Sequence, residues 1–341
     1  MIDRSLTWTA AIAASIAVLL LVERPAAGQS PSSAAKAATK PSIPRTADGH
    51  PSFEGTWNDR SLTPIERRKE LGGKEFYTDE EFAQMKAMLA QGKLPEGFGR
   101  LRTGAENSVQ YNQELYGFDQ TKAPLASTKR TSLIVGPEGV IPPMLPEARQ
   151  RNEERAAKVR GHETDTYLNQ ALSERCIQGG LPMLPMLPSP ADQNSLFHVA
   201  QGPGYVGITQ EEFHDTRVIP TDGRPHIPQN IRQWQGDSVG HWEGDTLVVD
   251  VTNFDDRRAW RGSTEALHLV ERFTRISEDT IIYRVTVEDP KTWATPWTVE
   301  VPWTKSDQTM FEYACQEGNT DLATILRGAR TQEAEAAKKG Q

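Results

Sequence analysis

Polar side chains that can transfer protons are concentrated in one stretch of the sequence, residues 214–245. Three of the seven histidines lie there, together with carboxylates, arginines and two tryptophans. Because a histidine beside a carboxylate is the usual means of proton transfer near neutral pH, we expect His214 or His241 to exchange a proton. Asp215 is expected to orient the histidine. These residues are the first candidates for a catalytic site.

The same stretch offers groups that could bind a small molecule. Arg217 is expected to hold an anionic group of the ligand, and the remaining binding candidates are Arg232, Trp234 and Asp237. Loops that carry such side chains beside a rigid sheet are where binding and catalysis concentrate. The alternative is that these polar groups only satisfy the buried backbone of a long, proline-rich crossover.

A further acid is predicted in the apolar segment 268–273. In a strand, Glu271 shares its face with Leu269 and Phe273, so an inward-facing Glu271 would lie in an apolar lining where loss of water raises the pKa of its carboxyl group. A buried charge is costly unless it is paired, so Arg217 or Arg272 is the expected partner. Glu271 is therefore either a second catalytic acid or half of a structural ion pair, and Arg272 is a further candidate for ligand binding.

The sequence offers little support for a cofactor. It contains no HExxH, HxH or CxxC pair for a metal and no Walker A motif for ATP, so we predict neither a metal ligand nor a cofactor. Scattered histidines and carboxylates could still converge on a metal in the folded chain. A metal-dependent enzyme therefore remains a third hypothesis.

The elements that must position these residues are mostly strands. Eight strands are predicted at 196–201, 205–209, 216–219, 246–254, 267–275, 280–287, 297–303 and 310–314, from runs of β-branched and aromatic residues. A further short strand is expected at 131–135, and Gly244 marks a hairpin turn. Consecutive strands without intervening helices indicate an antiparallel meander. We therefore expect the polar residues to gather at the rim of a walled hollow.

Two helices are predicted in the first half of the chain. Thr78 and Glu81 form a capping box before an apolar stripe at helical spacing, and residues 147–160 form a very polar helix. The predicted fold class is α+β, mainly antiparallel β: a barrel-like or strongly curved sheet in the C-terminal half, with a helical and irregular N-terminal half. A single β-rich domain is expected at 48–330, after a flexible lead-in at 29–47 and before a polar tail at 331–341.

The N-terminus predicts export. Residues 8–22 are uncharged and apolar, Arg4 precedes them, and small residues follow at 25–28, which is typical of a secretory signal peptide spanning 1–28. The alternative is a retained membrane anchor. The predicted location is periplasmic or secreted, with no membrane contact after cleavage. In an oxidising compartment the two cysteines, Cys176 and Cys315, are expected to form a disulfide rather than supply a nucleophile.

Length and charge exclude several classes of protein. The chain has 341 residues, with 38 basic and 46 acidic side chains and a net charge of −8. This composition argues against a multi-span membrane protein, a coiled coil and a wholly disordered chain. No segment supplies the concentrated basic surface that nucleic acid requires, so a small molecule is the expected partner.

Several segments together resemble a family of exported bacterial proteins that has no established activity. The segments are 130–135 followed by 141–143, then 174–176, 214–220, 240–249 and 312–319. The resemblance spans about residues 44 to 330 and implies no particular reaction. Separately, Gly55-Thr56-Trp57 resembles the GxW strand of lipocalin-like barrels.

These observations support two main hypotheses of function. The first is an exported protein that binds a small organic ligand, with cofactor-independent acid–base chemistry (lyase, isomerase or hydrolase) as its catalytic form. The second is a non-catalytic periplasmic binding or envelope-structural protein, in which the same residues only pair with one another.

Overall fold

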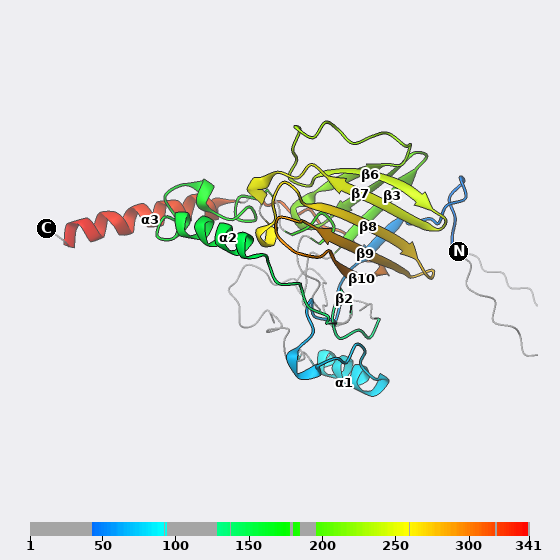
Figure 1. The fold of residues 1–341 in the computed structure, drawn as a ribbon. Coiled ribbons are helices and arrows are strands. Elements are labelled where there is room, and N and C mark those ends of the chain that lie inside the picture. Colours follow the sequence, from blue (N-terminus) through cyan, green and yellow to red (C-terminus); the bar gives the residue numbers. More distant parts are fainter. Residues whose placement is uncertain are drawn as a thin grey trace, which may run out of the picture. The chain divides into compact units, whose positions relative to one another are not determined.

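The computed structural model contains one large antiparallel sheet (Figure 1). It describes residues 43–91, 93, 128–136, 138–177, 180–184, 196–258, 260–317 and 319–339. The predicted signal peptide and residues 29–42 of the lead-in lie outside this part. The strands are β1 (Gly55–Asn58), β2 (Ile134–Val135), β3 (Leu196–Gly202), β4 (Tyr205–Gln210), β5 (Thr216–Pro220), β6 (Asp237–Glu243), β7 (Thr246–Thr252), β8 (His268–Arg275), β9 (Thr280–Glu288) and β10 (Trp297–Ser306). The fold is therefore α+β and mainly antiparallel β, as predicted.

The order of the strands explains how the sheet curls. It runs β5-β4-β3-β1-β10-β9-β8-β7-β6, with β2 pairing separately with β10. β5 and β6 stand at opposite ends of this order and yet lie beside each other. No ladder joins them among the described residues, so the sheet curves round without closing into a barrel. We call the gap between β5 and β6 the seam.

Alternating side chains fill the inside of the curved sheet. On β8 and β9 every second residue faces inward and is buried, as the period of a strand requires, and on β10 the same holds for Trp297, Val299, Val301 and Trp303. Phe197 stacks on Trp303 with ring centroids 4.4 Å apart, and Phe273 and Tyr283 pack against the same tryptophan. The predicted central hollow is thus occupied by core side chains.

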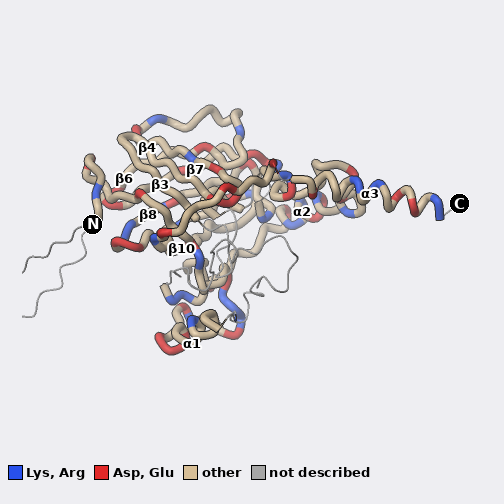
Figure 2. The backbone as a smooth tube through the Cα atoms, turned by 180° about the vertical axis from the view of Figure 1, so that it is seen from behind, with Lys and Arg blue, Asp and Glu red and all other residues tan. Residues whose placement is uncertain are grey.

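Three helices are described beside the sheet. They are α1 (Asp79–Ala90), α2 (Pro146–Val159) and α3 (Thr320–Lys339), and charges of both signs alternate along α2 and α3 (Figure 2). The predicted capping box is present, since Thr78 accepts a hydrogen bond from the Glu81 amide and the Glu81 side chain accepts from the Thr78 amide. Residues 331–339, predicted as a polar tail, form the second half of α3.

Two strand predictions were wrong for physical reasons. Residues 310–314 form no strand, because Cys315 is bonded to Cys176 and the Phe311 amide donates to Glu211 at 2.9 Å instead of joining a ladder. β6 was missed because its polar residues hide the strand pattern. The predicted turn at Gly244 is confirmed, since that residue has φ 59° and joins β6 to β7.

Candidate functional site

A pocket of about 1020 Å³ lies along the seam. Its walls come from β5, the start of β6, the loop 221–236 that connects these two strands, the β3–β4 turn and a segment around Ile177 and Met183. Five of the residues predicted from the sequence line it: Asp215, Arg217, Arg232, Trp234 and Asp237. The sequence thus located the polar stretch that forms the pocket, although the pocket lies at the seam and not inside the sheet.

The predicted histidines lie outside the lining of this pocket. His214 is exposed, and no hydrogen bond within the described part of the chain joins it to Asp215. His214 ends a short 3-10 turn with φ 56° and precedes β5, and it makes no side-chain hydrogen bond to Asp215, so Asp215 does not orient His214 as expected. His241 is exposed on β6 and contacts Glu243 at 3.3 Å, and Arg272 pairs with the same carboxylate at 2.6 Å.

Asp215 is held by two glutamines instead of a histidine. Gln235 Nε2 donates to its Oδ2 at 2.8 Å, and Gln210 Nε2 donates to the same oxygen at 3.4 Å. Burial raises the pKa of Asp215, against the opposing effect of these hydrogen bonds. The amide oxygens of both glutamines are buried and have no hydrogen-bond partner. Sequence reasoning gave neither glutamine a role.

Arg217 and Glu271 form a buried ion pair, which is one of the two alternatives that the sequence left open for Glu271, and the partner is Arg217 and not Arg272. Arg217 Nη1 lies 3.0 Å from Glu271 Oε1, and its Nη2 bonds the other carboxylate oxygen. Ser238 accepts from Arg217 Nε at 2.8 Å, and the Tyr283 hydroxyl donates to Glu271 at 2.8 Å. Burial raises the pKa of Tyr283 well above its ordinary value. The charge of Arg217 is therefore already neutralised, which removes the reason to expect an anion beside it.

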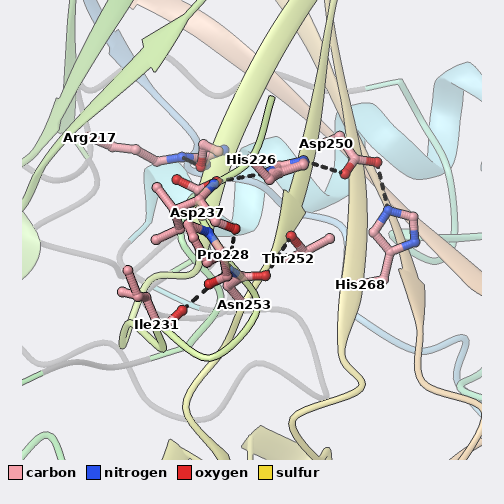
Figure 3. A network of polar contacts seen from close by, with 11 residues as sticks. Arg217, His226, Pro228, Ile231, Asp237, Asp250, Thr252, Asn253 and His268 are labelled. Atoms are coloured by element: carbon pink, nitrogen blue, oxygen red, sulfur yellow. Dashed lines mark hydrogen bonds and ion pairs between the residues drawn. The ribbon is translucent and has the colours of Figure 1, made fainter. Parts of the chain in front are cut away.

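The loop 221–236 is attached to the outer face of the sheet by a row of polar side chains (Figure 3). His226 lies between two carboxylates, with Nδ1 2.6 Å from Asp237 and Nε2 2.8 Å from Asp250. Asp250 also bonds His268 at 2.7 Å. The hydrogen bond from His268 lowers the pKa of Asp250, and the same bond raises the pKa of His268.

Asn253 provides a second attachment for the same loop. This buried residue donates its Nδ2 to the carbonyl oxygens of Ile227, Pro228 and Ile231, at 3.1, 3.1 and 3.2 Å. Sequence reasoning missed Asn253, Asp250 and His268. The available signal was alternation, since Asp250 stands between two buried valines and must face outward.

Two short glycine motifs associated with catalysis occur in the chain without their structural context. Residues 236–240 spell GxSxG, but Ser238 lies within strand β6 and accepts a hydrogen bond from Arg217, instead of sitting on a strand-to-helix turn. Residues 202–207 spell GxGxxG, but they form the turn between β3 and β4, with no helix following. Neither motif supports a nucleophile or a dinucleotide site.

The described residues include no cluster of three or more histidine, cysteine or carboxylate side chains arranged to hold a metal ion. None of the described helices is long and apolar enough to cross a membrane. The predicted disulfide between Cys176 and Cys315 is confirmed.

Comparison with known proteins gives weak similarities. No protein family matches the sequence, and no curated protein is similar to it. One similar solved structure is a secretary abundant heat soluble (SAHS) protein from Ramazzottius varieornatus, with 8% identity over 33% of this chain and 70% of that chain, at a TM-score of 0.22. Another is a variant of the fluorescent protein UnaG, with 14% identity over 35% of this chain and 78% of that chain, at a TM-score of 0.21. No functional argument rests on either, and the resemblance to exported bacterial proteins stays a prediction.

Proposed function

We propose that this is an exported protein that binds a small organic molecule in the seam pocket. The observation that carries the proposal is the lining itself: a pocket of about 1020 Å³ in which Asp215 is oriented by two amide groups and forms no ion pair among the described residues. Pockets that bind small molecules combine an apolar lining with a few oriented polar groups. Asp215 is such a group.

The geometry favours binding over acid–base catalysis. The histidines expected to exchange a proton lie outside the lining, and His226, which stands between the lining residues Pro225 and Ile227, is engaged by carboxylates on both ring nitrogens. General acid–base catalysis needs a group within hydrogen-bond reach of the proton it moves. Asp215 is the remaining candidate for such a step.

Export is supported by two independent features. The apolar segment at residues 8–22 is typical of a signal peptide. The disulfide between Cys176 and Cys315 is of a kind that persists in oxidising compartments. We therefore expect the ligand to be one that the protein meets in the periplasm or outside the cell.

The proposal is tested by filling the pocket. Val218 lines it from β5 and is 63% exposed, so Val218→Trp adds bulk with little cost to the core. Ile276 is 56% exposed and lies outside the lining, so Ile276→Trp is a matched control. Native mass spectrometry of protein purified from the periplasm should detect a bound molecule in the unmodified protein and in Ile276→Trp, but not in Val218→Trp. Equal occupancy in both variants would refute the pocket.

A further inference from the structure

The charged residues of the pocket are almost all paired. Arg224 lies 2.6 Å from Asp222, and its hydrogen bond lowers the pKa of that carboxyl to about 2. Asp237 is paired with His226. Because Glu271 neutralises Arg217 as well, only two of the Asp, Glu, Lys and Arg side chains in the described lining have no ion-pair partner.

These two side chains are Asp215 and Arg232, and they differ in burial. Arg232 is exposed, and its Nη1 donates to the Glu265 carbonyl at 3.2 Å. Its charge is screened by water. Asp215 is half-buried and is therefore screened much less. The uncompensated charge that a bound ligand would meet is negative.

The hydrogen-bonding groups around Asp215 lack donors. Gln210, which is 2% exposed, and Gln235 both use Nε2 to bind Asp215, which fixes each amide because the reverse orientation would set oxygen against oxygen. Their Oε1 atoms have no partner. Asp215 Oδ1 likewise accepts no hydrogen bond within the described residues. Buried polar groups are normally satisfied, so the two Oε1 atoms would be satisfied by a ligand that donates hydrogen bonds.

Apolar side chains also line the pocket beside these polar groups. Ile177, Met183, Ile227, Trp234 and Val239 all line it. Trp234 has the guanidinium of Arg257 4.7 Å from its ring centroid, which fixes the indole. A ligand with an apolar or aromatic body would bury its surface against these side chains.

We infer that the pocket takes a primary amine in its protonated form, with the ammonium group on Asp215 Oδ1 and an apolar body against the Trp234 side. This inference rests on the proposed function and names the class of ligand. The ammonium group supplies both the missing positive charge and the missing N–H donors, and a hydrogen bond between two ionised groups is about twice as strong as a neutral one. Gln210 and Gln235 act as positioning residues that aim the carboxylate.

Three matched probes separate charge from hydrogen bonding. Isothermal titration of the purified mature protein with 2-phenylethylammonium should show binding. The neutral alcohol 2-phenylethanol has the same body without the charge, and the N,N,N-trimethyl derivative keeps the charge without N–H groups. We expect both to bind at least about tenfold more weakly, as the loss of a charge-assisted hydrogen bond predicts.

Two variants localise the effect to one carboxylate. Asp215→Asn should weaken binding of 2-phenylethylammonium at least about tenfold. Asp245→Asn removes one exposed carboxylate outside the lining and should leave the affinity within about twofold. Circular dichroism verifies that each variant is folded. Affinity for the amine should also fall in acid as Asp215 is protonated.

The outcomes distinguish the two proposals. If the alcohol binds as tightly as the amine, or if Asp245→Asn weakens binding of the amine as much as Asp215→Asn does, the amine inference is overturned while the pocket stands. If none of the three probes binds although a co-purifying molecule is displaced by Val218→Trp, the amine inference is again overturned. If Val218→Trp displaces nothing, the proposed function itself fails.

Discussion

The ion pair between Arg217 and Glu271 lies where a curved sheet would ordinarily place apolar side chains. Glu271 is fully buried, and its two oxygens are occupied by Arg217 and Tyr283. Because each charge is compensated, the pair is tolerated, but removing one partner leaves the other charge buried alone. Arg217 comes from β5 and Glu271 from β8, so the pair reaches inward from the seam and ties the edge strand β5 to the sheet.

We predict that Arg217→Met lowers the free energy of unfolding by about 3–5 kcal/mol, because it strands the Glu271 carboxylate. Urea unfolding of the oxidised protein measures the change. The double variant Arg217→Met with Glu271→Leu should recover most of the loss, since replacing a buried pair by apolar residues is often neutral. If the double variant is no more stable than Arg217→Met, then the loss of free energy of unfolding comes from losing the ion pair itself and not from leaving the Glu271 carboxylate unpaired.

Asp215 should make the stability of the folded protein depend on pH. Burial raises its pKa above the ordinary value of 3.8, so the folded protein favours the protonated form. Its contribution to stability is therefore present below the ordinary pKa and is lost as the pH rises through the folded-state pKa. Asp215→Asn should thus raise the melting temperature at neutral pH and leave it unchanged near pH 3. An equal shift at both pH values would contradict this assignment.

The sequence was sufficient to predict the surroundings of Glu271 but not those of Asp215. Glu271 and Arg217 were predictable because alternation assigns a face to each strand residue, and a buried carboxylate needs a cation. The partners of Asp215 were not predictable, since Gln210 ends β4 and Gln235 ends the loop. Only the folded seam brings them to one carboxylate, whereas the adjacent His214 makes no side-chain hydrogen bond to it within the described residues.

The loop 221–236 forms one wall of the pocket, and its position depends on Asn253. This residue has φ 62°, a conformation that asparagine and glycine tolerate, and its amide contacts three carbonyl oxygens of the loop. We predict that Asn253→Gly, which keeps the backbone conformation and removes the amide, speeds amide hydrogen exchange in residues 221–236. The loss corresponds to about 1–3 kcal/mol of local stability.

A second substitution at this position sharpens the prediction. Asn253→Asp replaces the donor with oxygens that face the same three carbonyls, so exchange in the loop should be faster than in Asn253→Gly. Exchange in β9, which does not contact the loop, serves as the internal control. Unchanged exchange in 221–236 for both variants would show that the loop is held without Asn253.

The row of histidines and carboxylates on the outer face should make the free energy of unfolding depend on pH. His268 is bonded to Asp250 and faces Glu288 at 3.5 Å, and these contacts raise its pKa above 6.5. A raised histidine pKa contributes stability that is fully present below 6.5 and is lost as the pH rises through the folded-state value. His268→Gln should therefore cost more stability near pH 5.5 than near pH 9 in urea unfolding. A cost independent of pH would contradict the bond to Asp250.

At the scale of elements, strands with a clear alternation were predictable and polar ones were not. Seven of the eight strands predicted after residue 195 are present, because β-branched and aromatic residues alternate clearly in them. β6 carries Asp237, Ser238, His241 and Glu243 and was taken only as a polar stretch. β1 lies between β3 and β10 in the sheet although it is far from both in sequence, a pairing that no local pattern specifies.

At the scale of the whole molecule, the disulfide connects two parts of the chain that the sheet does not pair. Cys176 and Cys315 are separated by 139 residues. Nearby, Asn319 donates to the Glu174 carbonyl at 3.0 Å, and Arg330 on α3 donates to the Thr164 carbonyl at 3.1 Å. Ile177, next to Cys176, lines the pocket, so the C-terminal segment restrains one wall of the binding site.

We therefore predict that removing the disulfide affects both stability and the pocket. Replacing Cys176 and Cys315 by serine should lower the free energy of unfolding by about 4–5 kcal/mol in the chain-entropy model, since the bond closes a long loop. Exchange of the Ile177 amide should accelerate, while exchange in β8 stays unchanged until global unfolding. Wild-type protein treated with a reductant should match the double variant in urea, and reductant should not alter the variant further. If the oxidised wild type and the variant unfold at the same urea concentration, then the sheet and the contacts of Asn319 and Arg330 alone hold this wall in place.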